Sequence, residues 1–499
     1  MLFNSFLFIG LVILTFIFYY LPFFSKFQIS LLILSSLIFY SYNQPILVLL
    51  LLFSVSINII SSYYIVYGKT NFKKAYAIGG VALNLSILLF FKYSPLFAKS
   101  FFNESSSVGE FLLTMPLPIG ISFFTFQGIS LVIDVYKEKH CSNKELVAES
   151  FIIHAKQILF FKGFFPQLIS GPIVKAHDFI PQIEIKKISL INWDSVFKSI
   201  LLGYFLKMVV ADNLKDFTFW ITFPYFQESS TITLIVMLFG FSCKIFADFA
   251  GYSLIAIGLA KLFGYNFKDN FNFPYIATSF KDFWKRWHIS LSSFLMEYLY
   301  IPLGGNRKGK YRTYLNLMIV MFLGGLWHGA AWSYAIWGSF HGLALAIEKF
   351  LNDKVVNKLK YRHRVPEFSL KDSSISDNER GATEGINPKT ALIVKIFKGL
   401  MIFSFITFAW LLFKLPNFEH VIEYFKCIFR NTRIEDSYRL ITFIMLYSSP
   451  VIIYHLFYLL KNKKIYFQFR KIEYVFYGIM LFLIIVNSGS SGAFIYFQF

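Results

Sequence analysis

The chain has little cysteine and little charge. Its 499 residues include three cysteines, Cys141, Cys243 and Cys427, which lie far apart without C-x-x-C spacing, so neither a disulfide framework nor a zinc knuckle is predicted. Charged residues make up 15% of the chain and hydrophobic residues 56%, and the mean hydropathy is +0.57. This composition excludes a soluble globular protein, because water could not cover so much apolar surface.

The apolar residues occur in long runs that can cross a hydrocarbon core of about 30 Å. We therefore expect an all-α polytopic membrane protein with about eleven to thirteen membrane-embedded helices. The runs lie near 5–24, 29–42, 45–67, 76–93, 111–135, 151–174, 195–222, 231–264, 313–331, 333–350, 391–415, 438–460 and 473–497. Broken helices are expected at three pairs of prolines, since such breaks are tolerated at membrane depth only against protein or a water-filled cavity. The pairs are Pro116 and Pro118, Pro166 and Pro172, and Pro274 and Pro302.

The net charge of +20 comes from 48 Lys and Arg against 28 Asp and Glu. In a polytopic protein this excess indicates cytoplasmic loops beside anionic lipid, not nucleic acid. Basic stretches at 69–74, 352–364 and 461–471 are predicted to be cytoplasmic, which places both chain ends outside the membrane of a bacterial cell. No secretory cleavage site follows the first apolar run, so we expect it to remain as a helix of the inner membrane.

The chain is predicted to form one membrane domain, 1–499, with its chemical motifs in a core at 115–350. The segment 352–390 is polar, mixed in charge and without an apolar period, so it is predicted to be a flexible cytoplasmic loop. The residues 391–499 are expected to supply C-terminal helices and a tail. No internal repeat is visible, which disfavours inverted-repeat transporters.

The densest polar cluster runs from Asp282 to Ser290 and contains Trp284, Arg286, Trp287 and His288. One interpretation is an interfacial aromatic belt with snorkelling cations. The other is a substrate tunnel, in which Asp282, Trp284, Arg286 and Trp287 position the substrate. Asn306, in the polar stretch that follows, is a further candidate for that role.

A histidine, His328, lies inside the apolar run Leu323-Gly-Gly-Leu-Trp-His-Gly-Ala-Ala-Trp332. Small residues let neighbouring helices approach closely, so His328 is predicted to be enclosed by protein. It is either a core histidine that links two helices or a general base for acyl transfer, since imidazole can accept a proton from an attacking hydroxyl. His288, beside Arg286 and Asp282, would orient the substrate or stabilise the oxyanion. A metal site is not expected, because His341 is thirteen residues from His328 and no cysteine is near.

The chain resembles the membrane-bound O-acyltransferase (MBOAT) family, in particular its bacterial alginate O-acetylation branch. Six motifs carry the resemblance in the order of the family: Pro118-Ile-Gly-Ile-Ser-Phe-Phe-Thr-Phe-Gln127, Phe165-Pro-Gln-Leu-Ile-Ser-Gly-Pro-Ile173, Phe246-Ala-Asp-Phe-Ala-Gly-Tyr-Ser253, Asp282 to Leu291, Tyr300 to Lys308 and Gly324 to Trp332.

This resemblance implies an O-acetyltransferase with His328 as its essential histidine and His288 as its second. It implies a ring of helices around a central tunnel, no bound cofactor, and an acyl thioester co-substrate, either acetyl-CoA or an acyl carrier protein, from the cytoplasm. It also implies a polysaccharide or cell-wall glycan acceptor outside and a periplasmic SGNH-type acetyltransferase as partner. A D-alanyl transferase for teichoic acid and a membrane transporter remain the alternatives.

The chain ends in Phe494-Ile-Tyr-Phe-Gln-Phe499, after a Ser-Gly-rich stretch from Ser488 to Gly492 that is predicted to act as a flexible hinge. The terminus fits an interfacial aromatic belt. It also resembles the C-terminus of the small partner subunit of the D-alanylation system, which implies that Tyr496 accepts the acyl group as a relay.

Five further polar residues receive structural interpretations. Lys244 and Asp248 are spaced to form an i, i+4 ion pair. Asp134, Asp212 and Asn213 are candidate helix caps.

Overall fold

The computed structural model describes residues 1, 3–42, 44–103, 105–138, 142–169, 171–362, 388–460, 471–490 and 492. All regular secondary structure in the described residues is helical and they contain no strand, which confirms the all-α prediction. The long helices are α1 Phe6–Tyr20, α2 Gln28–Ser41, α3 Leu47–Tyr67, α4 Lys73–Phe101, α6 Ile121–Lys137, α8 Phe151–Gly163, α11 Trp193–Tyr204, α13 Thr231–Leu262, α16 Lys310–His328, α17 Trp332–Arg362, α19 Pro388–Ala409, α21 Phe418–Arg430, α22 Tyr438–Leu460 and α24 Glu473–Val486.

Short helices connect these elements. They are α5 Ser107–Leu113, α7 Asn143–Leu146, α9 Phe165–Leu168, α10 Ala176–Phe179, α12 Asp212–Phe217, α14 Phe280–Arg286, α15 Ile289–Leu295 and α20 Leu411–Lys414, with π-helical turns at Phe205–Ala211 and Met296–Tyr300. Single 3-10 turns lie at Pro22–Phe27, Thr70–Phe72, Ile180–Gln182, Ile188–Leu190, Phe219–Ile221, Tyr225–Glu228 and Pro274–Ile276.

Six helical segments of the described chain are long and apolar enough to cross a membrane: Pro22–Ser41, Leu47–Tyr67, Thr70–Phe101, Thr231–Leu262, Leu392–Lys414 and Tyr438–Leu460. Phe6–Tyr20 and Glu473–Val486 are shorter apolar helices. These segments confirm a multi-pass membrane protein. The larger number of eleven to thirteen embedded helices stays a prediction, because the remaining runs are broken or carry more charge.

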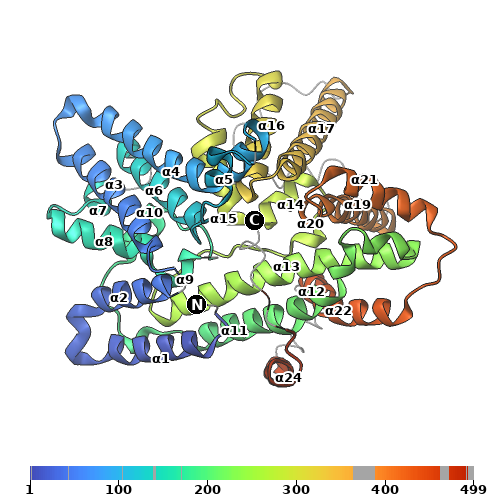
Figure 1. Cartoon of the computed structure of the whole chain (residues 1–499), viewed down its shortest axis with the longest axis horizontal. Coiled ribbons are helices and arrows are strands. Elements are labelled where there is room, and N and C mark those ends of the chain that lie inside the picture. The colour runs from blue at the N-terminus through green and yellow to red at the C-terminus, as the bar shows by residue number, and fades with distance from the viewer. Residues whose placement is uncertain are drawn as a thin grey trace.

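The breaks occur at the predicted prolines. Pro116 and Pro118 lie between α5 and α6, and Pro172 lies between α9 and α10. Pro274 opens a 3-10 turn, and Pro302 follows the π-helical turn Met296–Tyr300. As a result, the short helices α14 and α15 lie near the middle of the molecule, surrounded by longer helices (Figure 1).

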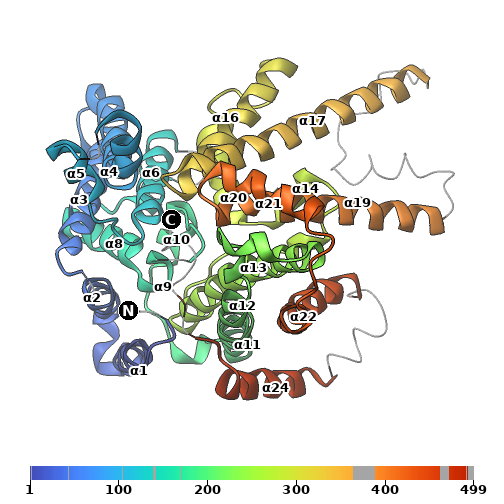
Figure 2. The same cartoon turned by 45° about the vertical axis from the view of Figure 1, so that its right-hand side comes forward.

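The long helix α13 runs through the centre of the fold and packs against α11, α12 and α22 (Figure 2). Its residues are largely buried from Thr233 to Ala260, as expected for the most central span. α16 and α17 form an antiparallel pair that stands beside α14 and α15. This pair carries His328 at the end of α16.

Four structural interpretations from the sequence were wrong. Asp134 caps no helix, because it lies inside α6, where it accepts a hydrogen bond of 2.7 Å from the Tyr298 hydroxyl. Asp212 starts α12 without acting as its cap, since its carboxylate pairs with Lys207 at 2.7 Å. Asp248 also pairs with Lys207, at 2.9 Å, and Lys244 has no carboxylate within ion-pair distance among the described residues. Asn213 is no cap either: its side chain donates to the carbonyls of Val209 and Asn487.

Candidate active site

His328 is enclosed because α16 and α17 cross at glycines. A Cβ atom on Gly325 would collide with the backbone of Tyr334 and Gly338, and one on Gly338 would collide with the Met321 carbonyl. The helices can therefore approach only because both positions lack side chains. This confirms the prediction that His328 is surrounded by protein, and the side chain is 3% exposed.

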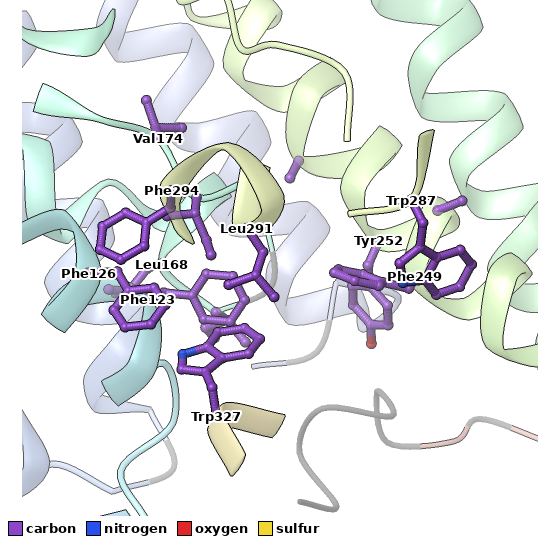
Figure 3. Close-up of a cluster of buried hydrophobic side chains, with 14 of the residues drawn as sticks. Phe123, Phe126, Leu168, Val174, Phe249, Tyr252, Trp287, Leu291, Phe294 and Trp327 are labelled. Carbon is purple, nitrogen blue, oxygen red and sulfur yellow. The ribbon is translucent and has the colours of Figure 1, made fainter. Parts of the chain in front are cut away.

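Aromatic rings surround the His328 imidazole. The ring centroids of Trp327, Trp337 and Phe413 lie 5.1, 5.2 and 5.1 Å from its own. Figure 3 shows Trp327 directed towards Phe123, Phe126 and Leu291, with its indole stacked on Phe126 at 5.5 Å. This packing fixes the backbone of the dipeptide Trp327-His328 and excludes water from one side of the imidazole.

His328 also lines a cavity of about 810 Å³. The cavity extends along α17 from Trp337 to Asp353, which at 1.5 Å per residue is about 24 Å. Its inner end is formed by His328, Trp284 and Trp337, and its outer end by polar side chains. The latter are Lys281, Lys285, Glu348, Lys349, Asn352 and Asp353.

A second, smaller cavity of about 100 Å³ is lined by Trp327, Lys92 and Ser122, together with residues 117–121. Lys92 is buried, and its ammonium donates to the Trp327 carbonyl and to Ser122 Oγ. Consecutive residues of α16 thus line the two cavities, Trp327 the smaller and His328 the larger. Sequence reasoning missed Lys92, because a single lysine in an apolar run carries no motif.

His288 lies next to His328, with 6.5 Å between the ring centroids. This separation is too long for a direct hydrogen bond between the rings, but an oxygen atom placed between them can approach both. His288 is fully buried and adopts a left-handed backbone conformation with φ of 45° at the start of α15. A non-glycine residue in this conformation is strained and is held by its surroundings.

Asn270 is the residue that holds His288, and no sequence motif pointed to it. Its side-chain oxygen lies 3.2 Å from His288 Nδ1 and accepts bonds from the Ser290 backbone N–H and hydroxyl at 3.1 and 2.9 Å. Its amide nitrogen donates to Ser253 Oγ on α13. Because the oxygen of Asn270 can only accept, His288 Nδ1 must donate, and in the neutral imidazole Nε2 is then the proton acceptor.

The other predicted site residues divide into two groups. Trp284 and Asn306 line the large cavity, and the Tyr300 hydroxyl donates to Asn306 at 2.5 Å. Arg286 pairs with Asp282 at 2.8 Å and donates to the Asn272 carbonyl, outside the cavity lining. Trp287 is 2% exposed and packs on Trp410 and Phe283, so it is a core residue and not part of an interfacial belt.

We expect Asn270→Ala to lower the turnover number by about 10- to 100-fold, since small errors in the position of a catalytic group have effects of that size. The KM should change little, because Asn270 does not line the large cavity. Steady-state kinetics in detergent separate the two quantities. Asn431→Ala, which removes a buried asparagine bound to the carbonyls of Gln227 and Ser229, is the matched control. Equal losses in both variants would mean that Asn270 is merely structural.

Tyr496 lies outside the described residues, as does most of the segment 352–390. The stretch that precedes Tyr496 is described up to Gly492, apart from residue 491, and is hydrogen-bonded to α12 and to the π-helical turn before it. The flexible hinge predicted for Ser488 to Gly492 is therefore wrong for its described residues.

Several known proteins are similar to this chain. Residues 106–362 match the family described as "MBOAT, membrane-bound O-acyltransferase family". The peptidoglycan O-acetyltransferase of Helicobacter pylori is 33% identical over 417 residues, which cover 79% of this chain and 72% of that protein. The "Probable alginate O-acetylase" of Pseudomonas putida is 40% identical over 278 residues, 54% of each chain. The teichoic acid D-alanyltransferase of Bacillus subtilis is 27% identical and covers 46% of this chain and 59% of that protein.

The matched region contains both histidines, both α16 and α17, and all residues of the large cavity. The chain spans about half the length of the alginate O-acetylases and nearly three quarters of the peptidoglycan enzyme. It belongs to the membrane-bound O-acyltransferase family.

Proposed function

We propose that this protein transfers an acetyl group from a cytoplasmic thioester to a hydroxyl group of a polysaccharide or cell-wall glycan outside the inner membrane. The observation that carries the proposal is the large cavity that ends at His328. Its polar end contains Lys281 and Lys285 of α14 and Lys349 of α17, and α17 continues beyond Lys349 to Arg362 through part of the basic stretch. The positive-inside rule assigns that end to the cytoplasm, where acetyl-CoA and acyl carrier proteins occur.

His328 acts as the general base in this scheme. It accepts the proton of an attacking hydroxyl while the oxygen bonds to the thioester carbonyl carbon. The carbon–sulfur bond then breaks, and the thiolate leaves and takes up a proton. His288, whose Nδ1 donates to Asn270 and whose ring lies 6.5 Å from that of His328, positions the reacting hydroxyl.

The attacking hydroxyl in the first step is the phenol of Tyr496. The acetyl-tyrosine ester that forms is then attacked by an acceptor hydroxyl, which takes the acetyl group and restores the phenol. Two short transfers replace one transfer between distant substrates. The second cavity, lined by Trp327 while His328 lines the first, supports access from two directions. A periplasmic SGNH-type acetyltransferase would receive the acetyl group and complete its delivery to the glycan.

Acetylation is favoured over D-alanylation because the O-acetyltransferases match at 33% to 40% identity and the D-alanyltransferase at 27%. The names of these relatives specify peptidoglycan and alginate, so we propose a glycan of this kind as the acceptor of this chain.

Reconstituted liposomes test the function. With labelled acetyl-CoA or acetyl carrier protein on the side of the basic loops, we expect the protein to discharge the thioester and to deliver label to oligosaccharide on the other side. Liposomes with His328→Gln should show neither reaction. Movement of intact solute without discharge of any thioester would indicate a transporter and overturn the proposal.

A further inference from the structure

Lys92 on α4 contacts the end of α16 at the small cavity. Its ammonium donates a hydrogen bond to the Trp327 carbonyl. The next residue of α4, Tyr93, donates from its hydroxyl to the Leu326 carbonyl at 2.9 Å. These bonds tie two consecutive carbonyls of α16, directly before His328, to α4. The position of Lys92 relative to His328 is therefore fixed.

The charge of Lys92 is buried without a counter-charge. The residue is 8% exposed, and its two acceptors, the Trp327 carbonyl and the Ser122 hydroxyl at 3.3 Å, are both neutral. No carboxylate lies within ion-pair distance of it among the residues that the structure describes. An ammonium has three donors, so one of them is left without an oxygen or nitrogen acceptor in the described chain. Because a buried charge is costly unless it is paired, Lys92 requires an anionic partner.

The small cavity has room for such a partner beside Lys92. Its volume of about 100 Å³ is several times the roughly 10–15 Å³ that a single water molecule needs. Apart from Lys92 and Ser122, the side chains that line it are mostly apolar: Leu117, Pro118, Ile119, Ile121, Phe123, Ile169 and Trp327. In a concave apolar site of this kind, a single charged group fixes the orientation of a ligand of opposite charge.

A second buried lysine, Lys162, shows what distinguishes Lys92. Lys162 is 0% exposed and also donates to neutral acceptors, the Ser54 carbonyl at 3.1 Å and the Ser54 hydroxyl at 2.8 Å. Its ammonium lies over the Phe124 ring at 5.6 Å from the centroid, and it lines neither of the two cavities. Lys162 therefore links α8 to α3, and of these two lysines Lys92 is the one with space for a ligand.

The place of Lys92 on α4 assigns the small cavity to the outer side of the membrane. The helix begins at Lys73, inside the basic stretch 69–74 that the positive-inside rule assigns to the cytoplasm. Lys92 follows Lys73 by nineteen residues, which is about 28 Å at 1.5 Å per residue and close to the thickness of the hydrocarbon core. Leu117, which lines the cavity, is 39% exposed. A ligand of Lys92 would thus enter from outside, where the proposed acceptor glycan lies.

Lys92 and His328 are neighbours of the same indole. The Lys92 ammonium lies 5.4 Å from the ring centroid of Trp327, and the ring centroid of His328 lies 5.1 Å from it. Figure 3 shows this indole beside Phe123, which also lines the small cavity. The distance between the ammonium and the imidazole is therefore on the scale of one or two sugar residues.

We propose that the small cavity is a subsite for a carboxylate group of an acidic acceptor glycan. The Lys92 ammonium donates its remaining hydrogen bond to a carboxylate oxygen, which supplies the missing counter-charge. A carboxylate held there places a hydroxyl group of the same or the next sugar near His328. Lys92 thus determines which acceptor binds and takes no part in making or breaking bonds. The proposal rests on the proposed function in one respect, that the acceptor is a glycan outside the membrane.

Binding measured without any acyl donor tests the subsite. The probes are an oligosaccharide of uronic acid residues and the same oligosaccharide with its carboxyl groups reduced to hydroxymethyl groups, each titrated by calorimetry into the full-length protein in detergent. We expect the acid to bind about 10- to 100-fold more tightly, the effect of a hydrogen bond between charged groups. Equal binding of the two probes would overturn the subsite, and this comparison needs no substitution.

Two variants assign the preference to one lysine. Lys92→Gln should bring the affinities for the two probes close together. Lys162→Gln, the matched loss of a buried lysine away from both cavities, should keep the preference of the parent protein. An unchanged preference in Lys92→Gln, or an equal loss in both variants, would refute the assignment to Lys92.

Acetyl transfer separates the subsite from the proposed function. With an acetyl thioester as donor, kcat/KM should be higher for the acid than for the reduced probe, and Lys92→Gln should lose this ratio mainly through the acceptor KM. Transfer to both probes with equal kcat/KM would refute the subsite and keep the function. Binding of the acid that depends on Lys92, with no transfer to either probe, would refute the function and keep the subsite.

Discussion

Replacing His328 by alanine should lower acyl transfer by about 100- to 10,000-fold, the contribution typical of a general base. The imidazole lines the inner end of the large cavity and is the titratable side chain with which the thioester carbonyl can come into contact there. The fold should survive, since His328 packs mainly through ring contacts with Trp327, Trp337 and Phe413. The rate of thioester discharge, measured with purified protein in detergent, gives the loss directly.

His328→Gln strengthens the test, because glutamine fills most of the volume and keeps hydrogen-bonding atoms but accepts no proton near neutral pH. It should be as inactive as His328→Ala and more stable to heat. His154→Ala is the matched control, since His154 is also fully buried but bonds to Ser62, away from both cavities. Activity of His328→Gln near that of the parent protein would show that His328 is a core histidine.

The fold class could be predicted from the sequence because it follows from local properties. Long apolar runs require helices in a membrane. Pro118 and Pro172 lie in the breaks between helices, and Pro274 opens a 3-10 turn, because proline interrupts a helix by steric rules that depend on neighbouring residues alone. The enclosure of His328 could likewise be predicted, since Gly325 lies in the same run and Gly338 follows within three helical turns.

Contacts between distant segments could not be predicted in this way. Asn270 lies eighteen residues before His288, in a loop without any period, and only the folded backbone brings its amide to the imidazole. Lys244 and Asp248 illustrate the same limit. A lysine four residues before an acid is the weaker orientation for a helical ion pair, and Lys244 reaches back over Phe241 while Lys207 binds Asp248 from another helix.

Replacing Tyr496 by phenylalanine should abolish glycan acetylation if the phenol carries the acetyl group, with a loss as large as that of His328→Ala. The substitution removes one oxygen atom and keeps the ring, so an interfacial belt residue would tolerate it. Mass spectrometry of the C-terminal peptide after incubation with donor alone should find one added acetyl group in the parent protein and none in the variant. Phe494→Tyr combined with Tyr496→Phe is an informative companion, since it restores a phenol two residues away from its natural position in the sequence and should remain inactive. Normal glycan acetylation by Tyr496→Phe would leave direct attack by the acceptor hydroxyl, with His328 as base, as the mechanism of this chain.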